Sequence, residues 1–201
     1  ITFFLSESYS QTINSETHVF NNKRNPFWIS SNNNGVYSKG AIANFKILEE
    51  LKIIKYSAEI ILPLNNNKDT FFKQLYLSLN NDNFYFQVGK KTNLPKFNYL
   101  SSGSLVESNN ADPILKILMG SMDFNNISLR NIKFQYFIKI SHGWINNNEY
   151  IKNPYLHEKS LKLKKEISKN TSMILGLDHM AIWAGETINY GKQPSELRDF
   201  L

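Results

Sequence analysis

The stretch that decides the fold is Gln74–Gly89, which reads QLYLSLNNDNFYFQVG. Apolar residues occupy every second position on both sides of the Asn80–Asn83 run. A side-chain period of two is typical of β-strands, and an Asn-rich run between two such segments predicts a hairpin turn. A four-residue turn at this run places Leu79 opposite Phe84, with the apolar residues of both strands on one face.

The same period recurs outward from this hairpin. We expect strands at about 40–48, 56–62, 114–119, 131–140, 161–164 and 173–179. Residues 47–54 also fit a short amphipathic helix, but a turn at Glu49-Glu50 preserves the alternation that follows it. Residues 11–35 are interpreted as a polar lead-in and residues 91–113 as a long loop. The chain is therefore predicted to be all-β, built as an antiparallel meander.

Composition limits the function classes. The chain has 201 residues, no cysteine and a formal net charge of +6, so disulfide scaffolds, thiolate metal sites and cysteine nucleophiles are excluded. The basic residues are spread along the chain, so we expect no nucleic-acid partner. The alternation fits a soluble sandwich with an apolar core or a membrane barrel with an apolar outer face, and the period does not separate them.

Several motifs occur in the order found in one protein family. The most extensive are Ser141–Trp144, Asn153–Lys159 and Gly176–Gly185, which read SHGW, NPYLHEK and GLDHMAIWAG. Shorter matches are Asn25–Trp28, Gln74–Tyr76, Gly89–Lys91, Ser101–Leu105 and Gly191–Pro194. Together they cover most of the chain after about residue 20, and in this ordered set the chain resembles the capsule assembly Wzi family.

The resemblance implies a transmembrane outer-membrane β-barrel in a Gram-negative bacterium. Family members are not known as enzymes and take part in attaching or assembling surface capsular polysaccharide. They are longer, with about eighteen strands, so residues 21–201 are expected to be the N-terminal portion of an incomplete barrel. Residues 1–20 are expected to be a signal-peptide remnant and a polar lead-in, with a frayed strand at 1–5 as the alternative.

The partners implied by the resemblance are capsular polysaccharide and outer-membrane lipid, with no cofactor. Two other functions stay open. A porin-like channel would use the polar strand faces as a permeation path. An outer-membrane hydrolase would use a histidine as its base.

Four residues are candidates for carbohydrate binding, namely His142, Trp144, Tyr150 and Tyr155. Flat aromatic faces beside polar groups suit sugar rings. The alternative for Trp144 is an aromatic girdle at a membrane interface, and for Trp183 the girdle is preferred.

Charged residues suggest a structural role rather than catalysis. His157, Glu158 and Lys159 are predicted to form a hydrogen-bonded polar cluster. Leu161 stands where a helical zinc motif needs its second histidine, so we predict no metal site, and no catalytic residue is assigned. Four lysines occupy the polar positions of the alternating strands, namely Lys133, Lys139, Lys162 and Lys164. They either bind an acidic polysaccharide or balance charge inside the protein.

Overall fold

The computed structural model describes residues 10–20, 36, 40–64, 70–92, 111–129, 132–196 and 198. The strands are β1 (Ser10–Phe20), β2 (Gly40–Glu50), β3 (Ile54–Pro63), β4 (Phe71–Asn80), β5 (Phe84–Lys90), β6 (Leu115–Ser121), β7 (Asn125–Leu129), β8 (Ile132–Trp144), β9 (Ile151–Lys152), β10 (Tyr155–Ser168), β11 (Thr171–Trp183), β12 (Glu186–Thr187) and β13 (Gly191–Lys192). Within these residues, no helix is long and apolar enough to cross a membrane. The predicted signal-peptide remnant at 1–5 and the matches at Asn25–Trp28 and Ser101–Leu105 lie outside the described residues.

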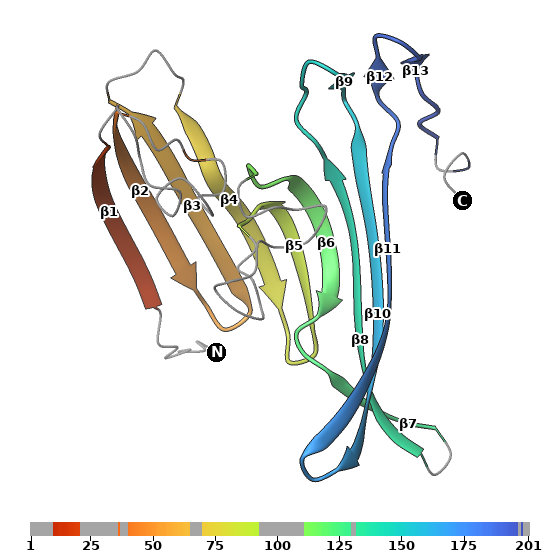
Figure 1. The fold of residues 1–201 in the computed structure, drawn as a ribbon. Coiled ribbons are helices and arrows are strands. Elements are labelled where there is room, and N and C mark those ends of the chain that lie inside the picture. Colours follow the sequence, from red (N-terminus) through yellow and green to blue (C-terminus); the bar gives the residue numbers. More distant parts are fainter. Residues whose placement is uncertain are drawn as a thin grey trace, which may run out of the picture. The chain divides into compact units, whose positions relative to one another are not determined.

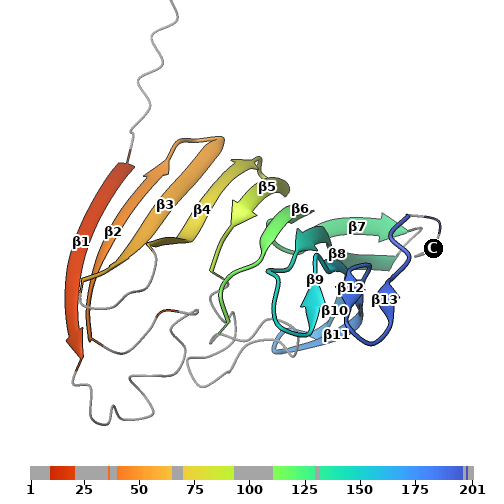
Figure 2. The ribbon, with the colours of Figure 1, turned by 90° about the horizontal axis from the view of Figure 1, so that it is seen from above.

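The chain divides into two compact units. The first comprises Ile1–Ser78 and Gly89–Pro113 and orders its strands β1-β2-β3-β4, side by side in one layer (Figures 1 and 2). The second comprises Leu79–Val88 and Ile114–Leu201 and orders its strands β5-β6-β8-β10-β11, with β7 also paired to β8. It also carries a small sheet in the order β13-β12-β9. The registers are antiparallel, so the predicted all-β antiparallel meander is confirmed.

Strand β1 lies in a segment for which the sequence predicted only a polar lead-in. It pairs with β2 from Ser10 opposite Glu50 to Phe20 opposite Gly40. Its sequence has few apolar residues to reveal a period, and the ladder to β2 rests on backbone hydrogen bonds that any such sequence can make. The next turn lies at residues 51–53, slightly later than predicted, where the Leu51 N–H donates to the Ile54 carbonyl at 2.7 Å.

The central hairpin has the predicted faces but a different register. The Asn81 N–H donates to the Phe84 carbonyl at 2.9 Å, so the turn is tighter than the predicted four residues. A Cβ placed on Gly89 would lie 2.7 Å from the Cα of Tyr76, which puts these two residues opposite each other. The pairing is therefore displaced by two residues from the predicted one. Because the side-chain period is two, this displacement leaves each side chain on its predicted face.

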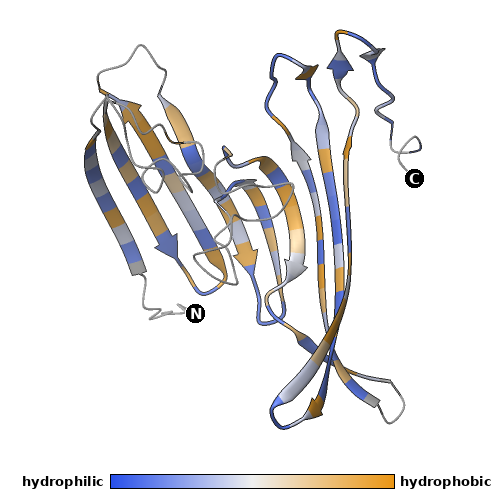
Figure 3. Cartoon of the chain, viewed as in Figure 1, coloured by the Kyte–Doolittle hydropathy of each residue, from blue (hydrophilic) through white to orange (hydrophobic). Residues whose placement is uncertain are grey.

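Burial along the strands is inverted relative to a soluble sheet. On β4, Leu77 is 48% exposed and the adjacent Ser78 only 3% exposed; on β6, Ile117 is 42% exposed and Lys116 only 6% exposed. Figure 3 shows the resulting alternation of apolar and polar positions along the strands. Further large apolar residues on exposed positions are Leu75, Leu79, Phe86, Val88, Met119, Leu161, Leu163, Leu175 and Leu177. In both units, many of the residues that a soluble sheet would leave in water are buried, and many apolar ones are not.

Candidate functional site

An aromatic cluster lies where β8, β10 and β11 meet the small sheet. Tyr155 at the start of β10 stands opposite Trp144 of β8 on one side and opposite Trp183 of β11 on the other. The ring of His142 lies between them, with centroid distances of 5.0 Å to Trp144, 5.3 Å to Tyr155 and 6.2 Å to Trp183. These contacts are mostly edge-to-face, a geometry worth about 0.5–1.5 kcal/mol per aromatic pair.

The aromatic cluster occupies the exposed apolar face of its strands. Leu161 and Leu177 form a cross-strand pair an even number of residues from the Tyr155–Trp183 pair, so both pairs project to the same side. Leu177 is 73% exposed. A row of Trp and Tyr at the end of an outward apolar band matches the interface position that these residues take in membrane barrels. The geometry therefore favours the girdle interpretation for Trp144 as well as for Trp183.

Tyr150, the fourth candidate for carbohydrate binding, lies on a different element. It precedes β9, is 73% exposed and hydrogen-bonds to the Glu149 carboxylate, which raises the pKa of the phenol. The structure thus brings His142, Trp144 and Tyr155 together and leaves Tyr150 outside that group.

Tyr150 instead lines a groove on the small sheet. Figure 1 shows this small sheet, β9, β12 and β13, at one end of β10 and β11. The groove has a volume of about 140 Å³, below the roughly 300–1,000 Å³ typical of enclosed small-molecule sites. Its lining includes Asn148, Tyr150, Lys152, Glu186, Thr187 and Ile188. It is an open groove whose lining residues include a tyrosine, two glutamates and a threonine.

The structure places His157, Glu158 and Lys159, which were predicted as one polar cluster, at consecutive positions of β10. Consecutive residues of a strand project to opposite faces, and Glu158 is 4% exposed whereas Lys159 is exposed. The Glu158 carboxylate lies 3.0 Å from the Nζ of Lys116 and accepts a hydrogen bond from the hydroxyl of Ser141. His157 stands opposite His142, with ring centroids 6.2 Å apart, beside the aromatic cluster.

Three of the four lysines at polar strand positions contact a carboxylate or an aromatic ring of the second unit. Lys139 Nζ lies 3.5 Å from the Glu158 carboxylate. Lys162 and Lys164 place their Nζ atoms 5.9 Å and 5.6 Å from the ring centroids of Phe137 and Phe124. Lys133 is exposed. Lys139 therefore fits internal charge balance, whereas Lys162 and Lys164 contact aromatic rings.

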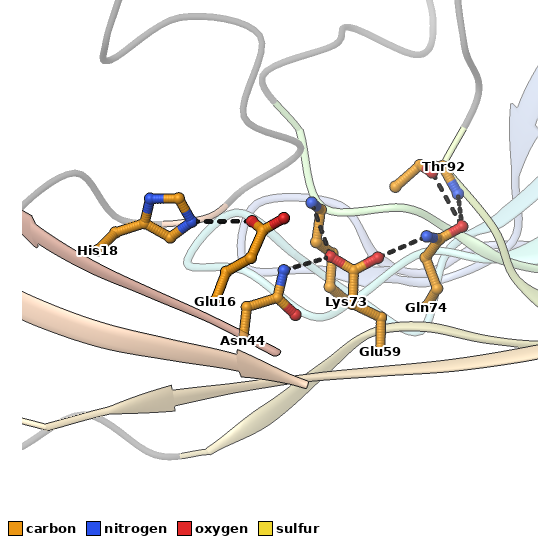
Figure 4. A network of polar contacts seen from close by, with 7 residues as sticks. All are labelled: Glu16, His18, Asn44, Glu59, Lys73, Gln74 and Thr92. Carbon is orange, nitrogen blue, oxygen red and sulfur yellow. Dashed lines mark hydrogen bonds and ion pairs between the residues drawn. The ribbon is translucent and has the colours of Figure 1, made fainter. Parts of the chain in front are cut away.

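A second buried network lies in the first unit, centred on Glu59 of β3 (Figure 4). Its carboxylate accepts hydrogen bonds from Asn44 at 3.0 Å and Gln74 at 2.6 Å, and pairs with Lys73 at 3.0 Å. The Gln74 side-chain carbonyl in turn accepts from the Thr92 hydroxyl at 2.9 Å. Three donors from β2 and β4 thus satisfy one buried carboxylate, as low-dielectric surroundings require.

Sequence reasoning missed Glu59 and Lys116 as members of these networks. Each was visible as a charged residue inside an otherwise apolar run, Lys116 within Ile114–Met119 and Glu59 beside Ile60. Their partners lie on other strands and far along the chain, so no local spacing identified them.

Comparison with known proteins returned no match to a protein-family model, a curated protein or a solved structure.

Proposed function

We propose that this chain is part of an outer-membrane β-barrel that helps to attach or assemble capsular polysaccharide at the surface of a Gram-negative bacterium, without catalysing a reaction. The proposal combines the motif resemblance to the capsule assembly Wzi family with the chemistry of the two strand faces. Its partners are capsular polysaccharide and outer-membrane lipid.

The observation that carries the membrane part is the inverted burial. Leucines on β4 are about half exposed while Gln74 and Ser78 are buried at 6% and 3% exposed. Water does not favour an apolar outer face of this extent, since exposed apolar area costs about 25 cal/mol per Å². Lipid does, and membrane barrels alternate apolar outward and polar inward along each strand. The buried networks around Glu59 and Glu158 suit such a polar interior.

The motifs that carry the resemblance are neighbours in the sheet. Ser141–Trp144 ends β8, Tyr155–Lys159 begins β10, and Gly176–Trp183 lies in β11. The register sets Trp144, Tyr155 and Trp183 in one row, although they are separate in the sequence. A shared structural role at one end of the sheet accounts for these motifs without any catalytic requirement.

The lengths of the connections between strands favour one orientation of the proposed barrel in the membrane. In the second unit, the links at 130–131 and 169–170 are short, and the link from β8 to β10 spans 145–154. In the first unit, the turn at 51–53 is short and the links at 21–39 and 64–70 are longer. Outer-membrane barrels have short periplasmic turns and longer extracellular loops. These lengths support an orientation in which residues 145–154 face the outer surface, where a capsule lies.

The test is capsule retention in a strain that lacks the gene. Cell-bound polysaccharide and polysaccharide released into the medium are measured separately, with a complemented strain as the control. An attachment factor predicts unchanged total synthesis with the polymer shed into the medium. Unchanged retention would overturn the proposal.

A porin-like channel is the second candidate, because the buried polar residues of the strands would line a pore. The purified protein in planar bilayers distinguishes the two. Stable single-channel conductance with normal capsule retention would favour the channel. The absence of conductance with a shed capsule would favour attachment.

A further inference from the structure

Three histidines and a lysine gather on the exposed apolar face of the second unit. His157 of β10 stands opposite His142 of β8, and their ring centroids are 6.2 Å apart. Lys159, the next residue of β10 on the same face, stands opposite His179 of β11. His157 lies within electrostatic range of the other three side chains. The register thus brings these four residues, called here the basic patch, into two adjacent rows of the sheet.

In the described strands, the positions beside the basic patch carry apolar side chains. Those in the same two rows are Ile117 and Met119 of β6, Ile140 of β8 and Ala181 of β11. The nearby carboxylates, Glu158 and Asp178, occupy the alternate positions and so lie on the opposite face. Glu158 is buried there and pairs with Lys116 and Lys139. The basic patch therefore makes this part of the apolar face positive, more so when the histidines are protonated.

The basic patch lies between the row of large aromatic rings and the leucines of the apolar face. Trp144, Tyr155 and Trp183 form the row on one side of it, and the cross-strand pair of Leu161 and Leu177 lies on the other. On the lipid face of a barrel, a lysine is costly at the middle of the bilayer and nearly without cost close to the interface, which Trp and Tyr mark. In the proposed barrel, the basic patch therefore stands where lipid headgroups meet acyl chains.

The side chains of the basic patch suit a phosphate group. Lys159 and His179 are exposed, and His142 and His157 are half-buried. An ammonium group has three donors, and a protonated imidazole donates from both of its ring nitrogens. Hydrogen bonds from such cations to phosphate oxygens are stronger than those between neutral groups. An anionic lipid adds acyl chains that match the adjoining leucines, which a free phosphate ion does not have.

We propose that the basic patch binds the phosphate of an anionic membrane lipid, whose acyl chains lie along the adjoining leucines. This inference rests on the proposed function, because only a barrel in a membrane presents this face to lipid. It adds the position of a specific lipid contact and the charge of the lipid headgroup.

The test measures the affinity of the complete protein, in a neutral detergent, for phosphatidylglycerol, phosphatidylcholine and inorganic phosphate. Phosphatidylglycerol is expected to bind most tightly, because it alone of the three combines a net negative charge with acyl chains. Its phosphodiester stays ionised between about pH 8 and about pH 5, whereas histidine gains a proton in this interval. Its binding is therefore expected to strengthen on acidification.

Variants locate the binding on the sheet. Lys159→Gln is expected to weaken phosphatidylglycerol binding about fivefold, as the loss of one basic group beside anionic lipid does, and Lys159→Arg to retain it. Lys165→Gln is the matched control, because Lys165 is an exposed lysine on the same face of β10, opposite Met173 and outside the basic patch. His157→Gln combined with His179→Gln is expected to remove most of the strengthening at low pH. Faster gel migration before boiling checks that each variant is folded.

Three results would overturn the assignment of the basic patch. They are equal affinity for phosphatidylglycerol and phosphatidylcholine, equal losses in Lys159→Gln and Lys165→Gln, and full strengthening at low pH in the double histidine variant. Displacement of the lipid by inorganic phosphate at a similar concentration would indicate a site for free anions and would also overturn the lipid assignment.

Failure of this inference is distinguishable from failure of the proposed function. If the deletion strain sheds its capsule and the protein fractionates with outer membranes, a negative lipid result overturns the basic patch alone. Recovery of the complete protein in soluble form would instead overturn the membrane barrel, and the lipid site with it.

Discussion

Lys116 and Glu158 form a buried ion pair across an intervening strand. The Nζ of Lys116 on β6 lies 3.0 Å from the carboxylate of Glu158 on β10, and β8 runs between them. The lysine passes Gly143 of β8, where an added Cβ would lie 3.1 Å from its Cγ. The glycine of the SHGW motif therefore leaves room for the side chain that neutralises Glu158.

Removal of one charge of this pair is expected to destabilise the protein strongly. Glu158→Gln leaves Lys116 and Lys139 near an uncharged group, and breaking a buried pair costs about 3–5 kcal/mol. The measurement is the free energy of unfolding in urea for the detergent-solubilised protein. Lys116→Met combined with Glu158→Gln is expected to cost less than the sum of the two single changes. Strict additivity would contradict a direct interaction.

Gly89 is expected to tolerate no side chain. Its φ of +122° disfavours other residues, and a Cβ would lie 2.1 Å from the Leu75 carbonyl oxygen. Gly89→Ala should destabilise the protein by more than about 3 kcal/mol, because backbone strain and a steric clash add. Gly191→Ala is the control, since Gly191 has φ +66° and open space at its Cβ position, and should cost about 1 kcal/mol. Equal effects in the same urea experiment would refute the close packing at Gly89.

Leu77 distinguishes a membrane barrel from a soluble sheet. A charged residue facing the middle of a bilayer costs about 2–4 kcal/mol, so Leu77→Arg should reduce assembly into outer membranes. Leu77→Ile keeps the position apolar and should assemble normally. In a soluble sheet, Leu77→Arg would be neutral or improve solubility, because the side chain is 48% exposed. Normal yield of Leu77→Arg in a soluble fraction would rule out the barrel.

The complete protein is expected to fractionate with outer membranes. A closed barrel resists detergent until it is heated, so the unboiled protein should migrate faster on a gel than the boiled protein. The isolated 201-residue chain should aggregate, because an open sheet leaves unpaired strand edges. Recovery of the complete protein from the periplasm in soluble form would contradict this expectation.

Much of the fold was predictable from local patterns. The alternation in Gln74–Gly89 predicts both strands and the face of every side chain, because a period of two survives a register displacement of two residues. Strand β1 was not predictable, since few apolar residues mark its period and its ladder uses backbone groups. The candidate site was predictable only in part. The rings of His142, Trp144 and Tyr155 meet because Trp144 and Tyr155 stand opposite each other on neighbouring strands. Tyr150 lies outside this group, in the Asn-rich turn that Asn148 stabilises.

The amino-acid sequence by itself determined the strand period, the polar and apolar faces, and the residue types available for binding. Each of these follows from neighbours within a few positions along the chain. The tertiary structure decided which face is buried, that Glu158 pairs with Lys116 and Lys139, and that Tyr150 lies with Glu186 around a groove. These relationships join residues far apart in sequence, so they depend on strand order and register, which no local spacing specifies.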